Sequence, residues 1–213
     1  MIRPNKKQLA LVWNCIEMLE TYREVYSTFG NDISKQYKLN EGDQRFWQNT
    51  LYEPLVASNL IHDDRFFVPD GTAKNYGLGN DFVATKMNYC NIMYQLYKTA
   101  ACGLEFEVYD ETATLVIDCI RMLEPYIYTI AGHAAGHEKV RKMGPDDIRK
   151  WQEVFLPKLV RGGPFLPDGT FFSTGASAHD IPNCGIGADG LYHEAAIPHF
   201  LSQCYKYLLK NAV

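Results

Sequence analysis

The sequence predicts a mostly α-helical protein built from two related halves. Three observations support this fold class: the chain matches itself at a constant offset, the matching stretches carry apolar residues at helical spacing, and strand-like alternation is scarce. We interpret the repeat as a tandem duplication of a three-helix unit, packed with pseudo-twofold symmetry and carrying long loops after a shared turn. The predicted units are residues 1–103 and 104–213, which we call the first unit and the second unit, together forming one compact domain.

The self-match begins at an offset of 104 residues. There "LVWNCIEMLETY" at 11–22 lies over "LVIDCIRMLEPY" at 115–126, and eight of the twelve positions agree. Without a gap, "DQRFWQNTLYEPLV" at 43–56 then lies over "DIRKWQEVFLPKLV" at 147–160. A long period that occurs only twice is not a solenoid, because solenoid repeats are shorter and more numerous.

The first helix of each unit is predicted over about 5–27 and 110–134. Its apolar residues recur at spacings of three and four, which places them on one face of a helix. The same face returns 104 residues later, so we expect equivalent core contacts in both units. The predicted core residues are Leu11, Val12, Cys15, Ile16, Leu19 and Tyr22, with Leu115, Val116, Cys119, Ile120, Leu123 and Tyr126 as their counterparts.

The second helix of each unit is predicted over about 43–60 and 146–161. Both copies begin with the pattern Asp-x-Arg-x-Trp-Gln, in which acidic residues favour a helix start and the tryptophans, Trp47 and Trp151, face inward. Pro145 suits the first turn, because no intrahelical partner awaits its missing amide hydrogen there. Since both units carry the motif, we interpret it as structural.

A turn and a third helix complete each unit. The turn is "RFFVPDGT" at 65–72 in the first unit and "GPFLPDGT" at 163–170 in the second, with five of eight positions in agreement. Proline, aspartate and glycine in this order are typical of turns. The third helix is predicted over about 82–102 and 191–211, and the only strand expected is a short piece around 104–110.

The loop before the third helix is longer in the second unit. From the turn to a lysine matched near the helix end, the first unit uses 26 residues (72–98) and the second uses 40 (170–210), a gain of 14. Most of the histidines also belong to the second unit. Long loops in compact domains are often functional, and a feature present in one copy is not needed for the shared fold. The enlarged loop at 168–193 is therefore the predicted functional site.

Candidate catalytic residues lie at the end of this loop. His193 has an ordinary pKa near neutrality and Tyr192 lies beside it, so the pair is suited to act as general base and general acid. His179 is the third candidate. The structural alternative is an ordinary helix start with an exposed histidine. The candidate ligand-binding residues are Asn75, Asp180, Asn183 and Glu194.

The stretch that contains "LPDGTFF" and "DGLYHEAAIPHFLSQCYKYL" resembles a loop and helix of (α/α) toroid carbohydrate-active proteins, such as alginate-lyase-like and heparinase-like polysaccharide lyases. The resemblance covers about 40 residues. In that group a tyrosine and a histidine abstract and return protons beside a uronic acid, while an asparagine helps to neutralise the carboxylate. The resemblance implies these roles for Tyr192 and His193, with Asn75 or Asn183 as the neutralising residue.

Two further histidines raise the question of a metal. His133 and His137 are one helical turn apart, so a continuous helix places both imidazoles on one face, where they could ligate a single divalent metal ion. The alternative that we favour is a pair of core histidines hydrogen-bonded to backbone. A divalent metal at this place is thus the alternative that we do not favour, and the sequence leaves the cofactor unknown.

Composition limits the partners and the compartment. The formal charge of -4, with both signs mixed along the chain, offers no basic stripe for nucleic acid. No apolar run approaches the roughly 18 to 20 residues that span a bilayer, and Glu17 interrupts any signal-peptide core. Six cysteines without a Cys-x-x-Cys pattern favour reduced thiols in a cytoplasmic protein.

From these observations we expect a soluble, cytoplasmic helical protein whose polar His/Tyr pocket binds a small molecule or a saccharide. Lyase or hydrolase chemistry is the catalytic version of this hypothesis, and the sequence leaves open whether the protein is an enzyme. The alternative is a non-catalytic structural or adaptor subunit, of the coat or scaffold type, that assembles with copies of itself. Neither hypothesis involves nucleic acid or a membrane.

Overall fold

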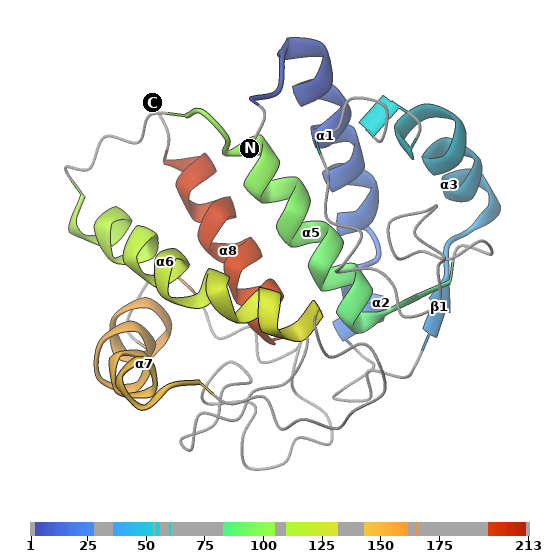
Figure 1. Ribbon diagram of the computed structural model, residues 1–213. Coiled ribbons are helices and arrows are strands. Elements are labelled where there is room, and N and C mark those ends of the chain that lie inside the picture. Colours follow the sequence, from blue (N-terminus) through green and yellow to red (C-terminus); the bar gives the residue numbers. More distant parts are fainter. Residues whose placement is uncertain are drawn as a thin grey trace.

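Figure 1 shows a computed structural model, which describes residues 3–27, 36–52, 54–55, 60, 83–104, 110–131, 143–161, 165 and 196–211. Most of these residues are helical, so the predicted all-α class is confirmed. The elements in chain order are α1 (Lys6–Glu20), α2 (Arg23–Ser27), β1 (Gln36–Lys38), α3 (Glu41–Phe46), η1 (Trp47–Tyr52), β2 (Val83–Thr85), α5 (Lys86–Ala100), α6 (Glu111–Ala131), α7 (Pro145–Lys150), η4 (Trp151–Arg161) and α8 (Ala196–Lys210).

The first helix of each unit forms close to its predicted bounds. α1 starts at a capping box, in which Asn5 accepts a hydrogen bond from the amide of Gln8 (3.0 Å) and the Gln8 side chain accepts one from the amide of Asn5 (2.9 Å). α1 ends at Glu20 and α2 follows as a separate helix, whereas α6 continues through Pro125. The predicted core faces of both helices are buried or half-buried.

The second helix of each unit changes from α to π geometry at the matched tryptophan. α3 passes into η1 at Trp47, and α7 passes into η4 at Trp151. The sequence predicted uninterrupted α-helices here, so this is a correction. Both indole side chains are almost fully buried at the junction. η4 also contains Pro157, which has no amide hydrogen to donate to a helical hydrogen bond.

Helices from both units form the centre of the molecule. α5 packs against α1 and α8, and α8 also packs against α6. Figure 1 shows α1, α5 and α8 side by side, with α3 on the outer side of α1 and α7 on the outer side of α6. Each unit therefore places its first and third helices in the core and its second helix on the flank.

Two short strands add a local feature that the sequence did not predict. β1 pairs with β2 in antiparallel register, with Tyr37 opposite Ala84. The strand predicted around 104–110 falls largely outside the described residues. The third helix of the first unit begins at Lys86, after β2, a few residues later than predicted. In the second unit α8 is described from Ala196, and the predicted start at 191 lies outside the described residues.

The described cysteines are not joined in disulfides. They are Cys15, Cys90, Cys102, Cys119 and Cys204. Burial raises the pKa of the Cys15 thiol, which keeps it protonated and unreactive at neutral pH. Within the described part of the chain, no helix combines the length and apolar character needed to cross a bilayer.

Candidate functional site

The loop that the sequence favours as the site lies outside the described residues. The same holds for every candidate catalytic, ligand-binding and metal-binding residue named above. These are His179, Tyr192, His193, Asn75, Asp180, Asn183, Glu194, His133 and His137. Their roles stay predictions. Among the residues that the structure does describe, no group of three or more His, Cys, Asp or Glu side chains is placed to hold a metal ion.

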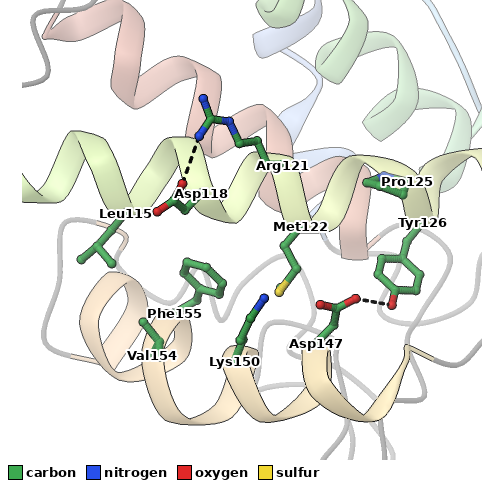
Figure 2. Close-up of a pocket in the computed structure, with 10 residues that line it drawn as sticks. All are labelled: Leu115, Asp118, Arg121, Met122, Pro125, Tyr126, Asp147, Lys150, Val154 and Phe155. Carbon is green, nitrogen blue, oxygen red and sulfur yellow. Dashed lines mark hydrogen bonds and ion pairs between the residues drawn. The ribbon is translucent and has the colours of Figure 1, made fainter.

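The structure shows a cavity of about 630 Å³ between α6 and the facing α7 and η4 (Figure 2). Small-molecule sites occupy about 300–1,000 Å³, so this volume suits a compact ligand. We call this cavity the second-unit groove, because all of its lining residues belong to the second unit. They are Leu115, Asp118, Arg121, Met122, Pro125, Tyr126, Asp147, Lys150, Val154 and Phe155.

Helical periodicity explains why these residues meet. On α6, the lining residues Asp118, Met122 and Pro125 follow one another at spacings of four and three, which aligns them on one face. On the facing helix, Asp147 and Lys150 are three residues apart and lie on the face toward α6. The groove therefore has an apolar floor and a charged border.

A hydrogen-bonded tyrosine joins the two walls of the groove. The hydroxyl of Tyr126 donates to Oδ2 of Asp147 at 2.7 Å and accepts a hydrogen bond from the amide of Gly144 at 2.9 Å. Figure 2 shows this contact at one end of the groove. Because the acceptor and the amide both belong to the start of α7, the tyrosine fixes that helix start against α6.

The first unit has the same contact at the positions 104 residues earlier. The hydroxyl of Tyr22 donates to Oδ2 of Asp43 at 2.5 Å and accepts from the amide of Asn40 at 3.1 Å. Burial, and then the bond to Asp43, raise the pKa of Tyr22 to about 12. The Asn40 side chain also donates to Asp43 at 2.6 Å. In the second unit Gly144 occupies the position that matches Asn40 and has no side chain to donate such a bond. Asp147 can therefore accept a hydrogen bond from another group where Asp43 accepts one from Asn40.

Two cations border the second-unit groove. Arg121 pairs with Asp118 at 3.3 Å, but the side chains are 75% and 53% exposed. Such an exposed pair contributes about 0–1 kcal/mol, so Arg121 can turn to another anion at little cost. Lys150 reaches into the groove toward Met122 in Figure 2 and forms no ion pair with the rest of the described chain.

The matched positions in the first unit have different charges. We call them the first-unit face. The residues that agree are Leu11, Met18, Tyr22 and Asp43, which match Leu115, Met122, Tyr126 and Asp147. The residues that differ are Asn14, Glu17, Thr21, Phe46, Thr50 and Leu51, which match Asp118, Arg121, Pro125, Lys150, Val154 and Phe155. Both cations of the groove are thus confined to the second unit.

Comparison with known proteins returns no match. No protein family, no curated protein and no solved structure matches this chain. The assignment of the site therefore depends on its own geometry and on the comparison between the two units.

The sequence reasoning above missed the groove although part of its signal was available. It placed Tyr126 on a core face and Asp147 in a structural motif, and both assignments agree with the observed hydrogen bond. It did not single out Arg121 and Lys150. Their signal was the change from Glu17 and Phe46 at matched positions of the repeat.

Proposed function

We propose that the protein is a duplicated helical scaffold whose second unit binds a small organic anion with hydroxyl groups, such as an acidic saccharide. The observation that carries this proposal is the second-unit groove, a cavity of about 630 Å³ bordered by Arg121 and Lys150. The first unit has Glu17 and Phe46 at the matched positions, so its frame is the same but it lacks the two cations.

The chemistry of the lining residues selects this ligand class. The planar guanidinium of Arg121 can bind a carboxylate through two parallel hydrogen bonds, and the ammonium of Lys150 adds a point charge. The carboxylate of Asp147 can accept hydrogen bonds from ligand hydroxyl groups. The apolar floor, including Phe155, offers a surface for the less polar face of a sugar ring.

The duplication is part of the same proposal. In its support, the order of first, second and third helix is the same in both units, and the α-to-π change occurs at the matched residues Trp47 and Trp151. The Tyr22 to Asp43 bond and the Tyr126 to Asp147 bond are also separated by 104 positions. Matched contacts of this kind are expected when one unit is copied.

Catalysis by the enlarged loop is a separable hypothesis. Lyase or hydrolase activity would depend on Tyr192 and His193, which lie outside the described residues. Binding of an anion by the groove does not require that activity. A cytoplasmic location is likewise a proposal, and the buried thiols of Cys15 and Cys204, which form no disulfide, support it.

Self-association is the second candidate function, and one observation favours it. Phe46 on α3 is 37% exposed at the position where the second unit has Lys150. An exposed aromatic side chain on the flank of the molecule is suited to contact another copy. If it does, the Phe46→Lys variant should form assemblies of lower average mass than the wild type does, as measured by light scattering. A wild-type protein that scatters as a monomer at all concentrations would remove this candidate.

A thermal-shift experiment tests the binding proposal. Glucuronate, neutral glucose and inorganic phosphate are compared as probes at millimolar concentration. We expect glucuronate to stabilise the wild type, by about 2.7 kcal/mol at a concentration of 100 times its Kd, and glucose to have little effect. Stabilisation by phosphate alone would indicate a phosphate-bearing ligand instead of an acidic sugar.

The variants give that experiment its control. Arg121→Glu with Lys150→Phe replaces the two cations of the groove with the residues at the matched positions of the first-unit face, and should abolish stabilisation by glucuronate. Phe46→Lys changes the matched position of the first unit and should leave the stabilisation intact. The proposal fails if no anion stabilises the wild type, or if the double variant responds as the wild type does.

A further inference from the structure

Two glutamates each meet a lysine from the other unit. Oε1 of Glu20, at the end of α1, lies 2.9 Å from Nζ of Lys206 on α8. Oε1 of Glu124, on α6, lies 2.9 Å from Nζ of Lys98 on α5. Each unit therefore contributes one glutamate and one lysine, and each of these residues pairs with the opposite charge in the other unit.

A tyrosine completes each pair. The hydroxyl of Tyr97 donates to Oε1 of Glu20 at 2.6 Å, and the hydroxyl of Tyr205 donates to Oε1 of Glu124 at 2.5 Å. In both cases the tyrosine comes from the same unit as the glutamate and precedes, in sequence, the lysine given to the other unit. Each cluster thus contains a glutamate, a tyrosine and a lysine joined by the same connections. The Glu124 cluster has one further member, Tyr94, whose hydroxyl donates to Oε1 of Glu124 at 3.1 Å and accepts from Nζ of Lys98 at 3.0 Å.

These contacts correct the match between the third helices. Glu20 and Glu124 are 104 residues apart, while Lys98 and Lys206 occupy the same place in their clusters and are 108 residues apart. The sequence agrees, since "QLYK" at 95–98 then lies over "QCYK" at 203–206. Matching Lys98 to Lys206, in place of Lys210, reduces the gain in the second loop from 14 residues to ten.

The clusters are partly sheltered from solvent. The Lys98 and Glu124 side chains are 14% and 25% exposed, and the Lys206 and Glu20 side chains are both 28% exposed. They flank the contact between α5 and α8, whose facing residues are largely buried. Charge pairs in such positions are less screened than surface pairs and fix which surfaces can meet.

We infer that the contact between the two units is a self-complementary surface that also fits a second copy of this chain. In a twofold contact, residue i of one side meets residue j of the other and j meets i, which is the pattern of the two clusters. The first unit of one copy can therefore pair with the second unit of another copy through the same four charged residues. Exchange of units in this way produces a dimer without any new contact.

The connection between the units determines which pairing dominates. Units in one chain have a high effective concentration for each other, so the pairing within a chain wins in dilute solution. Exchange is expected when chains refold together at high concentration, or when substitutions make the pairing within each chain repulsive. This inference does not depend on the ligand proposed for the second-unit groove.

Complementary charge variants of the full chain test the exchange. The acidic variant carries Lys98→Glu and Lys206→Glu, and the basic variant carries Glu20→Lys and Glu124→Lys. Each variant alone brings like charges together at both clusters. In a heterodimer formed by exchange, all four clusters of the dimer again pair a carboxylate with an ammonium group. After refolding together, native mass spectrometry should show heterodimers at least tenfold in excess of either homodimer.

Matched variants control for general electrostatic attraction. Lys7→Glu with Lys158→Glu, and Glu111→Lys with Glu153→Lys, change the net charge equally at exposed positions away from the clusters. The inference is overturned if the interface variants form no more heterodimer than these controls, whether or not each interface variant folds alone. It is also overturned if Lys206→Glu fails to recover stability lost in Glu20→Lys, because that reversal restores the pair within one chain.

Discussion

The first-unit face and the second-unit groove have the same hydrogen-bonded frame and different charges. In one, Tyr22 donates to Asp43 at 2.5 Å, and in the other Tyr126 donates to Asp147 at 2.7 Å. Around this frame, Glu17 is replaced by Arg121. The comparison separates the two kinds of residue: those that recur support the fold, and those that differ are free to give one unit a function.

The largest expected effect concerns residues that recur. Trp47 and Trp151 are 1% and 0% exposed, so Trp47→Ala and Trp151→Ala should each lower the free energy of unfolding by about 3–5 kcal/mol through lost burial and a residual cavity. Urea denaturation measures both losses. Trp13→Ala, at a 36% exposed position, should cost less. If only one of the two buried tryptophans proves important, the units are not structurally equivalent.

The shared tyrosines should have the next largest effect. Tyr22→Phe and Tyr126→Phe each remove a hydrogen bond to a carboxylate, which is expected to cost about 1.5–3 kcal/mol. Urea denaturation measures both losses. No loss of stability in either variant would contradict this account of the shared frame, in which each hydroxyl donates to a carboxylate of the second helix.

A residue that differs should affect binding and leave the fold intact. Arg121→Ala should weaken binding of glucuronate about tenfold, which corresponds to about 1.4 kcal/mol, while the free energy of unfolding changes by less than about 0.5 kcal/mol. Isothermal titration calorimetry measures the affinity. Arg149→Ala is the control, because Arg149 lies on α7, forms an ion pair with Asp146 and does not line the groove. Equal losses in both variants would mean that general charge attracts the ligand.

Acid should weaken the contact between the units. Burial alone would raise the pKa of Glu20, but hydrogen bonds from Tyr97 and Lys206, together with nearby cations, outweigh it and hold the pKa below the ordinary 4.5. A carboxylate whose pKa is depressed by folding stabilises the fold above its unfolded pKa, and this contribution is lost as pH falls through the folded value. The free energy of unfolding should therefore decline as pH drops below about 4.5.

The variant Glu20→Gln should show a shallower decline over that pH range. Glu17→Gln, at an exposed position of the same helix, serves as the control and should follow the wild type. Urea denaturation at pH 3 to 6 compares them. A Glu20→Gln profile parallel to the wild type would show that this carboxylate does not couple folding to pH.

The smallest expected effect comes from the exposed ion pair of the groove. Asp118→Asn introduces the amide that the first unit has at Asn14, and the pair with Arg121 is highly exposed. The free energy of unfolding should change by less than about 0.5 kcal/mol. Binding of glucuronate should stay equal or become slightly stronger, because Arg121 loses a competing partner. A large loss of affinity would instead make Asp118 a direct ligand contact.

Much of the fold could be predicted because the relevant signals are local. The core faces of α1 and α6 follow from apolar spacing, and the start of α7 follows from Pro145 at its first turn. The π stretches could not be predicted, because a side chain as large as Trp47 is compatible with either helix type and tertiary packing decides. The pairing of β1 with β2 joins segments far apart in the chain, which no local pattern encodes.

Little of the candidate site, in contrast to the fold, could be predicted from the sequence. The site predicted from the sequence was chosen for its histidines and consists of Tyr192, His193 and their loop, all of which lie outside the described residues. The groove needs two helices that meet through Tyr126 and Asp147, so its shape exists only after packing. The contact partners of Lys98 could not be inferred either, because the bond crosses from one unit to the other.

Residue-resolved NMR tests the central claim, that one unit alone has acquired a binding groove, most directly. Titration of the ¹⁵N-labelled protein with glucuronate should shift the amide signals of residues 115–126 and 145–155, and leave the matched residues 11–22 and 41–51 unchanged. Shifts of equal size in the matched residues, or shifts in neither set, would contradict the account.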